Sequence, residues 1–269
     1  MRTESYVLAL PVRLEGDGVF FEICLKTSIK AEVALQKENS LFYNQPPTDP
    51  QKPNKPNNQV RMSEYTVYRG AEGAIKPFPV PKPSLGPKEI LLSITHSGVC
   101  ATDLAYLPYG IALGHEGVGI VEAVGSEVTQ FKVGERAGGG YHRDSCGHCT
   151  YCLSGQDIWC YERSVFGEKD YNNGTFGEYY IGKETYLHRI PEGLASEHAA
   201  PLQCAGATTY SALVSVVKPG DRVGIMGIGG LGHLAIQFAR KLGTEVIVFS
   251  TSKSKEAVSY THLTLPRRG

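Results

Sequence analysis

Four cysteines lie close together at a spacing that suits a closed metal site. Cys146, Cys149, Cys152 and Cys160 form the pattern C-x2-C-x2-C-x7-C, and they are four of the seven cysteines in the chain. Four thiolates complete the tetrahedral shell of a structural zinc ion and leave no open position. The alternatives are four reduced thiols in a loop or a metal-free redox pair, although no strand–helix context surrounds the C-x2-C pairs. The cluster therefore predicts a structural zinc site.

Three residues far apart in the sequence could form a second, open metal site. Cys100 lies in the segment GVCATD, His115 in GHEGVG and Cys204 in QCAGAT. Two thiolates and one imidazole leave a fourth position for water or substrate, as a catalytic zinc ion requires. Spacing alone cannot bring Cys100 and Cys204 together, and each of the three residues taken singly is more often structural.

A glycine-rich segment predicts a dinucleotide site. The sequence GIGGLG at 227–232 follows a strand expected at 221–226 and precedes a helix expected at 231–242. A second buried strand is expected at 245–249, which completes a βαβ unit. The glycines allow the backbone to approach a pyrophosphate at the positive end of the helix. The expected cofactor contacts in this loop are Gly227, Gly229, Gly230, Leu231 and Gly232.

The residues after the second strand indicate which dinucleotide is bound. An NAD-binding domain usually places an acid about 20 residues past the loop, on the ribose 2′-hydroxyl. Here the chain has no acid between Glu245 and Glu256. Hydroxyls and lysines suit a 2′-phosphate, so the segment favours NADP(H) over NAD(H), with a solvated polar turn as the alternative. The candidate contacts are Ser250, Thr251, Ser252, Lys253 and Lys255.

The elements that must position these residues fall into three parts. Residues 1–61 end in a stretch rich in proline and asparagine, which predicts a disordered extension and linker. Residues 62–203 carry short β-rich runs between turns, with strands expected at 90–94, 117–124 and 176–181. Residues 204–269 begin an α/β unit with a helical period.

Charge and hydropathy exclude several classes of function. The chain has 269 residues, with 27 lysines and arginines against 27 aspartates and glutamates. This balance gives no electrostatic basis for binding nucleic acid or an anionic membrane. No apolar run approaches the ~20 residues that a membrane helix requires. The seven acids of residues 1–61 argue against a mitochondrial presequence, so we expect a cytoplasmic protein.

The order of these motifs resembles that of a known enzyme family. GVCATD, GHEGVG, the four-cysteine run, QCAGAT and GIGGLG occur in the order found in the zinc-dependent medium-chain alcohol dehydrogenases. The chain is most similar to their NADP-dependent, cinnamyl-alcohol-dehydrogenase-like branch, over residues 65–257. The resemblance implies a mixed fold, in which a GroES-like β-rich domain is followed by an α/β Rossmann domain.

The resemblance also assigns roles to individual residues. Cys100, His115 and Cys204 would bind the catalytic zinc ion, so that each chain would hold two zinc ions. Glu116 would be the adjacent acid that can approach the metal, and Thr102 the hydroxyl that touches the substrate oxygen. The remaining implied roles belong to Asp103, which would orient His115, and Thr208, which would lie against the nicotinamide.

The implied activity is hydride transfer between NADP(H) and a primary alcohol or aldehyde, with a homodimer expected for the intact protein. Many family members carry a histidine where this chain has Ala105, so the proton relay must use another group. The Rossmann domain is incomplete, and residues 259–269 depart from the family pattern. The open alternatives are an NAD-dependent polyol or formaldehyde-type zinc dehydrogenase and a catalytically inactive zinc-stabilised fragment.

Overall fold

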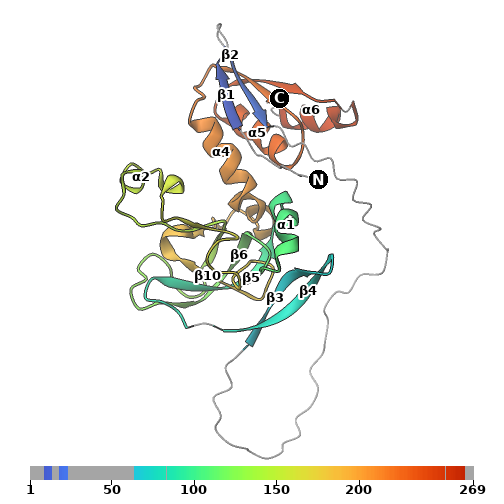
Figure 1. Cartoon of the computed structure of the whole chain (residues 1–269). Coiled ribbons are helices and arrows are strands. Elements are labelled where there is room, and N and C mark those ends of the chain that lie inside the picture. Colours follow the sequence, from blue (N-terminus) through green and yellow to red (C-terminus); the bar gives the residue numbers. More distant parts are fainter. Residues whose placement is uncertain (1–8, 14–17, 24–63, 83, 252, 264–269) are drawn as a thin grey trace, which may run out of the picture.

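The computed structural model describes residues 9–13, 18–23, 64–82, 84–251 and 253–263. These residues form a β-rich unit and an α/β unit that is joined to it by helix α4 (Figure 1). Among the described residues, no helix combines the length and apolar character that crossing a membrane would require.

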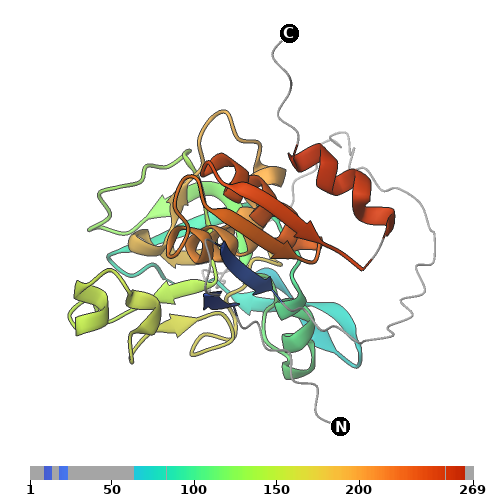
Figure 2. The same ribbon diagram turned by 90° about the horizontal axis from the view of Figure 1, so that it is seen from above.

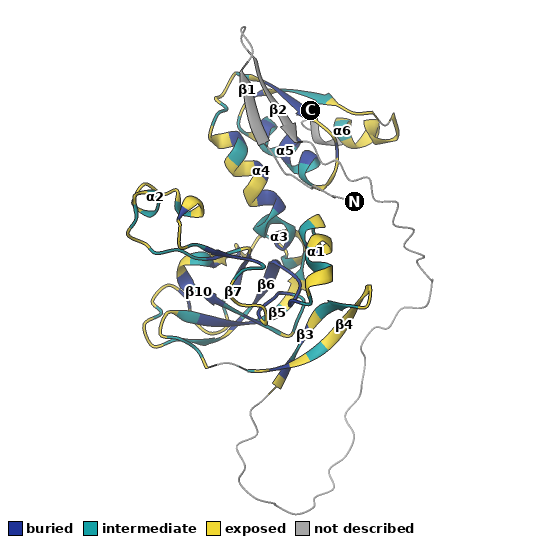
Figure 3. Cartoon of the chain, in the orientation of Figure 1, coloured by how far each residue is buried: buried dark blue, intermediate teal, exposed yellow. Residues whose placement is uncertain are grey.

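The β-rich unit is built on an antiparallel five-stranded sheet with the order β10-β5-β6-β7-β11. Its strands are β5 (Glu89–Ser97), β6 (Glu116–Val124), β7 (Arg136–Gly140), β10 (Tyr179–Lys183) and β11 (His188–Arg189). Two antiparallel strand pairs accompany the sheet: the hairpin of β3 (Glu64–Ala71) and β4 (Ala74–Pro81), and the pair of β8 (His142–Asp144) and β9 (Ser164–Val165), which are joined through α2 and η2. The core between these strands contains fully buried Ile90, Leu92 and Val121 (Figure 3).

Short helices close the loops of this unit. They are α1 (Ala101–Tyr106), η1 (Leu107–Tyr109), α2 (Thr150–Leu153), η2 (Asp157–Trp159), η3 (Glu184–Tyr186), α3 (Ser196–Ala199) and η4 (Pro201–Gln203). Helix α2 lies in a lobe that projects from the side of the sheet, and no residue of α2 is buried (Figures 1 and 3). This lobe carries the four-cysteine cluster.

The α/β unit contains the expected βαβ arrangement. Strands β12 (Arg222–Met226) and β13 (Glu245–Phe249) pair in parallel, and α5 (Gly230–Lys241) connects them. Helix α4 (Ala205–Val214) precedes this motif, and η5 (Lys253–Lys255) and α6 (Glu256–Leu263) follow it, with α6 lying to one side of the sheet (Figure 2).

Helix α5 packs through one face. Ala235, Ile236 and Ala239 are buried with Val223 and Ile225 of β12. The helix ends at Lys241, and Gly243 follows it with a φ of 84°, a left-handed value that glycine adopts without strain. The expected strand, helix and helix end are therefore confirmed in this unit.

Within residues 1–61, the structure describes only two short segments, and the expected disorder of this region stays a prediction. The structure describes strands β1 (Ala9–Arg13) and β2 (Gly18–Ile23), and β2 pairs in parallel with β12. The sheet order is β1-β2-β12-β13. An unpaired edge of β12 would leave backbone donors and acceptors without partners, and β2 supplies them. The linker at 44–59 lies outside the described residues.

One strand boundary differs from the sequence-based expectation. The strand expected at 176–181 begins at Tyr179, because the backbone N–H of Phe176 donates to Leu113 instead of joining the sheet. Helix α6 extends to Leu263, and the expectation that residues 259–269 depart from the family pattern stays a prediction. The domain limits at 61/62 and 203/204 remain a prediction.

Candidate metal centres and cofactor cleft

His115 is held in a fixed orientation at the start of β6. Its side chain is 0% exposed, and its ring lies 4.7 Å from the Phe166 ring, centroid to centroid. Nδ1 lies 3.0 Å from Oδ1 of Asp103, whereas Nε2 is buried and has no hydrogen-bond partner within the described part of the chain. A buried ring nitrogen without a partner costs free energy unless a ligand satisfies it. Nε2 is therefore placed to bind a metal ion.

Asp103 connects His115 to Cys100. Its Oδ2 accepts the backbone N–H of Cys100 at 3.0 Å, and its Oδ1 also accepts the backbone N–H of Gly114 at 2.9 Å. Cys100 is the N-cap of α1, so the start of this helix fixes the thiol as well as the carboxylate. One buried carboxylate thus positions two candidate ligands.

Cys204 joins this pair from the junction between the two units. It follows η4 and precedes α4. One ligand atom from each of Cys100, His115, Glu116 and Cys204 lies within 4.8 Å of the others. The fold therefore brings together the three residues that sequence spacing could not, and it adds Glu116 beside them. Thiolates with an imidazole and an adjacent carboxylate fit a zinc ion.

The charges of these groups are strongly coupled. A hydrogen bond with Cys204 lowers the pKa of Cys100 to about 3, and the same contact raises the pKa of Cys204. Burial acts to lower the pKa of His115, but its interactions with Asp103 and with the nearby Cys100 thiol outweigh burial and raise that pKa to about 9. Burial, aided by the charge of Cys100, raises the pKa of Glu116 to about 7. A divalent cation would compensate the negative charge that these groups share.

Glu116 depends on a glycine that the sequence analysis did not single out. A Cβ atom at Gly98 would lie 2.0 Å from Oε2 of Glu116, so a side chain there would displace the carboxylate. The backbone N–H of Gly98 also donates to the Glu116 carbonyl. In the sequence, the only feature that could have indicated this role of Gly98 was its position two residues before Cys100.

The four cysteines of the projecting lobe also converge. Their sulfur atoms all lie within 4.8 Å of one another. Backbone N–H groups support them: Cys149 N–H donates to Cys146 Sγ at 3.3 Å, and Cys146 N–H donates to Cys160 Sγ at 3.4 Å. Such donors stabilise thiolates, and four thiolates at this separation fit a closed tetrahedral metal site.

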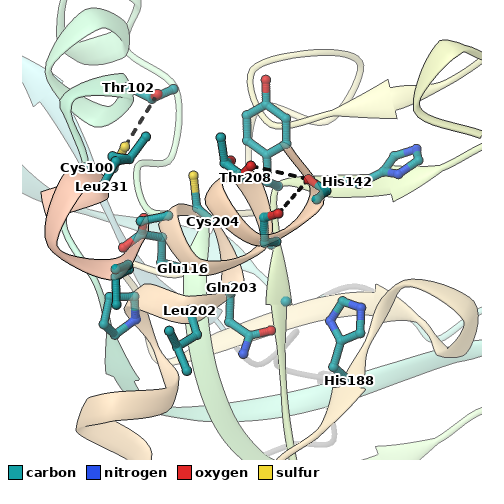
Figure 4. A pocket seen from close by; sticks show the side chains of 18 of the residues that line it. Cys100, Thr102, Glu116, His142, His188, Leu202, Gln203, Cys204, Thr208 and Leu231 are labelled. Carbon is teal, nitrogen blue, oxygen red and sulfur yellow. Dashed lines mark hydrogen bonds between the residues drawn. The ribbon is translucent and has the colours of Figure 1, made fainter. Parts of the chain in front are cut away.

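A cleft of about 1450 Å³ lies over the dispersed site and is lined by both units. Figure 4 shows Cys100, Glu116 and Cys204 on one wall, with Thr102 beside Cys100. The Cys100 thiol lies 3.6 Å from Oγ1 of Thr102. Thr208 and Leu231 line the same cleft from the α/β unit. The cleft therefore has room for a substrate and for part of a dinucleotide beside the candidate metal site.

The glycine loop provides a cradle at the start of α5. Gly227 has φ +87°, and a Cβ atom at Gly232 would lie 1.9 Å from the Gly227 carbonyl oxygen. Gly229 and Gly230 face open space, because nothing lies within 4 Å of a Cβ atom built at either position. The free N–H groups of the first helical turn can therefore bind phosphate.

The polar segment after β13 lies next to this loop. The backbone N–H of Gly227 donates to the carbonyl of Phe249, so the carboxyl ends of β12 and β13 meet. Thr251, Lys253 and Lys255 are exposed there, and so is Ser250. Ser252 lies outside the described residues. This geometry is compatible with a phosphate near the end of β13.

Comparison with known proteins identifies the family to which the chain belongs. Residues 86–192 match the family model described as the alcohol dehydrogenase GroES-like domain. An alcohol dehydrogenase of Geobacillus stearothermophilus is 42% identical over 186 residues, which cover 65% of this chain and 54% of that protein. Cinnamyl alcohol dehydrogenase 8 of Arabidopsis thaliana is 36% identical over 197 residues, which cover 68% and 55% respectively. This chain is a medium-chain zinc alcohol dehydrogenase family member.

Solved structures of the family agree with the fold. The structure of CAD from Helicobacter pylori, complexed with NADP(H), superposes with a TM-score of 0.66 at 30% identity. The match covers 74% of this chain and 61% of that one. The chain also spans about half the length of the curated relatives it matches. The expected GroES-like domain and partial Rossmann sheet are thus confirmed.

Several residues that line the cleft were not found from the sequence. Tyr141, His142, Trp159 and Tyr186 line it. Trp159 belongs to η2 in the four-cysteine lobe, and Tyr186 belongs to η3, which is distant in sequence from Cys100 and His115. No motif marks these positions, because their proximity depends on how the lobe folds against the sheet.

Proposed function

We propose that this protein transfers a hydride between NADP(H) and a primary alcohol or aldehyde, at a zinc ion held by Cys100, His115 and Cys204. The observation that carries the proposal is the buried, unpartnered Nε2 of His115 beside two thiols at the base of a cleft. When bound, zinc would supply Lewis acidity toward the substrate oxygen, and the nicotinamide would supply or accept the hydride.

The residues of the chain would bind and orient these groups. Asp103 would hold the Nδ1 proton of His115, which keeps the Nε2 lone pair directed at the metal. Oγ1 of Thr102 would accept the hydrogen bond of the substrate hydroxyl and pass a proton to water in the cleft, since Ala105 cannot serve as a relay. Thr208, whose backbone N–H donates to the Cys204 carbonyl, lines the cleft and would pack against the nicotinamide.

The preference for NADP(H) is supported by charge at the end of β13. A 2′-phosphate brings close to two negative charges, which an acid in this place would repel. Lys253 and Lys255 are exposed there, and the described sequence between Glu245 and Glu256 contains no acid. The Helicobacter pylori neighbour is complexed with NADP(H), which supports the same preference.

A second zinc ion would bind Cys146, Cys149, Cys152 and Cys160 and would hold the projecting lobe in shape. Reduced cysteines in both clusters are consistent with a cytoplasmic protein. The proposed partners are a small-molecule alcohol or aldehyde and, for the intact protein, a second copy in a homodimer.

Metal analysis of the purified chain tests the two sites. We expect about two zinc ions per chain, and about one in each of the variants Cys100→Ser and Cys146→Ser. Cys24→Ser is the matched control, because Cys24 belongs to neither cluster, and it should keep both ions. Retention of two ions in Cys100→Ser would contradict the ligand assignment.

Cofactor binding and turnover test the reaction. NADPH should bind more tightly than NADH, and Lys253→Ala with Lys255→Ala should weaken NADPH binding about tenfold, a loss of ~1.4 kcal/mol, while leaving NADH binding unchanged. Lys241→Ala is the control. Equal binding, or a preference for NADH, would favour the NAD-dependent alternative. Two bound zinc ions without turnover on any alcohol or aldehyde would favour the inactive zinc-stabilised fragment.

A further inference from the structure

A second group of metal-binding side chains lies beside the four-cysteine cluster and shares one thiol with it. Cys146, His148 and Glu162 each place one ligand atom within 4.8 Å of the other two. Cys146 also belongs to the four-cysteine group. Thiolate, imidazole and carboxylate are all ligands that zinc accepts. One cysteine is therefore common to two different sets of ligands.

Hydrogen bonds to the cluster hold both additional residues in place. Nδ1 of His148 lies 2.8 Å from the carbonyl oxygen of Cys146. When the Nδ1–H group donates this bond, Nε2 keeps the lone pair that a metal requires, as is usual for histidine ligands. The backbone N–H of Glu162 donates to Cys160 Sγ at 3.3 Å. The cysteine cluster thus positions the imidazole of His148 and the backbone from which the Glu162 carboxylate extends.

Exposure differs between the two sets of ligands. His148 and Glu162 are exposed, Cys146, Cys149 and Cys152 are half-buried, and Cys160 is only 2% exposed. An ion arriving from solvent therefore meets the exposed imidazole and carboxylate first and the buried thiol last. A closed four-thiolate shell needs such an entry path, because it leaves no open position once it is formed.

We propose that Cys146, His148 and Glu162 form a loading site through which a divalent zinc ion enters the four-cysteine site. This inference rests on the proposed structural zinc site. The ion first binds the Cys146 thiolate, Nε2 of His148 and the Glu162 carboxylate, and Cys146 stays bound throughout. Cys149, Cys152 and Cys160 then each form a bond to the ion and release a thiol proton to solvent, while His148 and Glu162 are displaced.

The direction of this exchange follows from ligand chemistry. Four thiolates bind zinc more tightly than one thiolate with an imidazole and a carboxylate, so the ion moves inward. The shared thiolate keeps the ion attached while the other ligands change. Removing His148 and Glu162 should therefore slow loading without altering the final complex.

The rate of cobalt uptake tests the loading site. The full chain carrying Cys100→Ser and Cys204→Ser removes the thiolates of the catalytic site, so that cobalt–thiolate absorption reports on the lobe. The reduced, metal-free protein is mixed with limiting Co²⁺ in a stopped-flow instrument. Adding His148→Ala with Glu162→Gln should slow the rise of this absorption by about tenfold or more, since even a lost supporting contact costs 10–100-fold in metal affinity.

Matched controls separate this effect from a general loss of structure. His96→Ala with Glu127→Gln alters the same residue types at exposed positions of the β-rich unit and should load at the parental rate. The final absorption and the cobalt stoichiometry should be equal in all variants. A rate for His148→Ala with Glu162→Gln within twofold of the control would overturn the loading site.

Two other outcomes are equally decisive. A lower final stoichiometry in the His148→Ala, Glu162→Gln variant would assign these residues to the resident ion and would overturn a purely kinetic role. Absence of cobalt–thiolate absorption in the parental Cys100→Ser, Cys204→Ser protein would instead refute the four-cysteine metal site itself, so the two failures are distinguishable.

Discussion

The substitution Asp103→Asn tests whether one carboxylate organises the catalytic ligands. Asp103 is 3% exposed and accepts three N–H groups, from Cys100, Gly114 and His115, at 2.9–3.0 Å. An asparagine of the same shape replaces one acceptor oxygen with an NH₂ group, which must face one of these donors. At least one charge-assisted bond is lost, and a buried donor is left without a partner.

The expected cost follows from these contacts. A hydrogen bond to a charged group contributes about 1.5–3 kcal/mol, and an unsatisfied buried donor costs about 1–3 kcal/mol. Because both figures describe the loss of the same contact, they are not summed. We expect the free energy of unfolding to fall by about 2–4 kcal/mol, which corresponds to a decrease in Tm of about 5–10 °C. Zinc affinity at the proposed site of Cys100, His115 and Cys204 should fall about 10–100-fold, because His115 loses its orienting partner.

Thermal and denaturant unfolding measure the first quantity, and competition with a chromophoric chelator measures the second. Asp221→Asn is the matched control, because its carboxylate accepts a single exposed backbone N–H from Lys218 at 2.8 Å. It should change stability by less than about 1 kcal/mol. If Asp103→Asn kept wild-type zinc affinity and lost no more stability than Asp221→Asn, the central role of this carboxylate would be refuted.

Two further predictions concern the glycine loop and a histidine of the cleft. Gly232→Ala should lower stability and abolish dinucleotide binding, because the added Cβ atom would overlap the Gly227 carbonyl. Denaturation and cofactor fluorescence measure the two effects. Gly230→Ala is the control: its added Cβ atom faces open space, so this variant should lose much less stability. Burial lowers the pKa of His142 below 6.5, so the unfolded chain takes up this proton first and stability falls as pH drops below 6.5. His142→Gln should reduce this loss, and an unchanged slope of unfolding free energy against pH between 6.5 and 5 would contradict the assignment.

Local sequence patterns were sufficient for the βαβ unit. The strand expected at 245–249 is β13, and the helix expected at 231–242 differs from α5 by one residue at each end. Both elements are determined by short-range periodicity and by Gly243, whose φ value ends the helix. Information of this kind is present within a window of about 15 residues.

Long-range contacts account for what the sequence did not provide. The meeting of Cys204 with Cys100 depends on the packing of two units, and no local spacing encodes it. The pairing of β2 with β12 joins segments about 200 residues apart, and it depends on an open sheet edge instead of on residue composition. The motif resemblance supplied the ligand set where physical reasoning from spacing could not.

The position of Cys204 has a mechanical consequence. Two of the three expected ligands belong to the β-rich unit, whereas Cys204 lies immediately before α4, the helix that leads into the α/β unit. A metal ion bound by all three residues would link the β-rich unit to the start of α4 at one point in the cleft. Binding of the ion and the relative orientation of the units would then be thermodynamically linked, so that each stabilises the other. The proposed metal ion would thereby also influence the width of the cleft that the two units line.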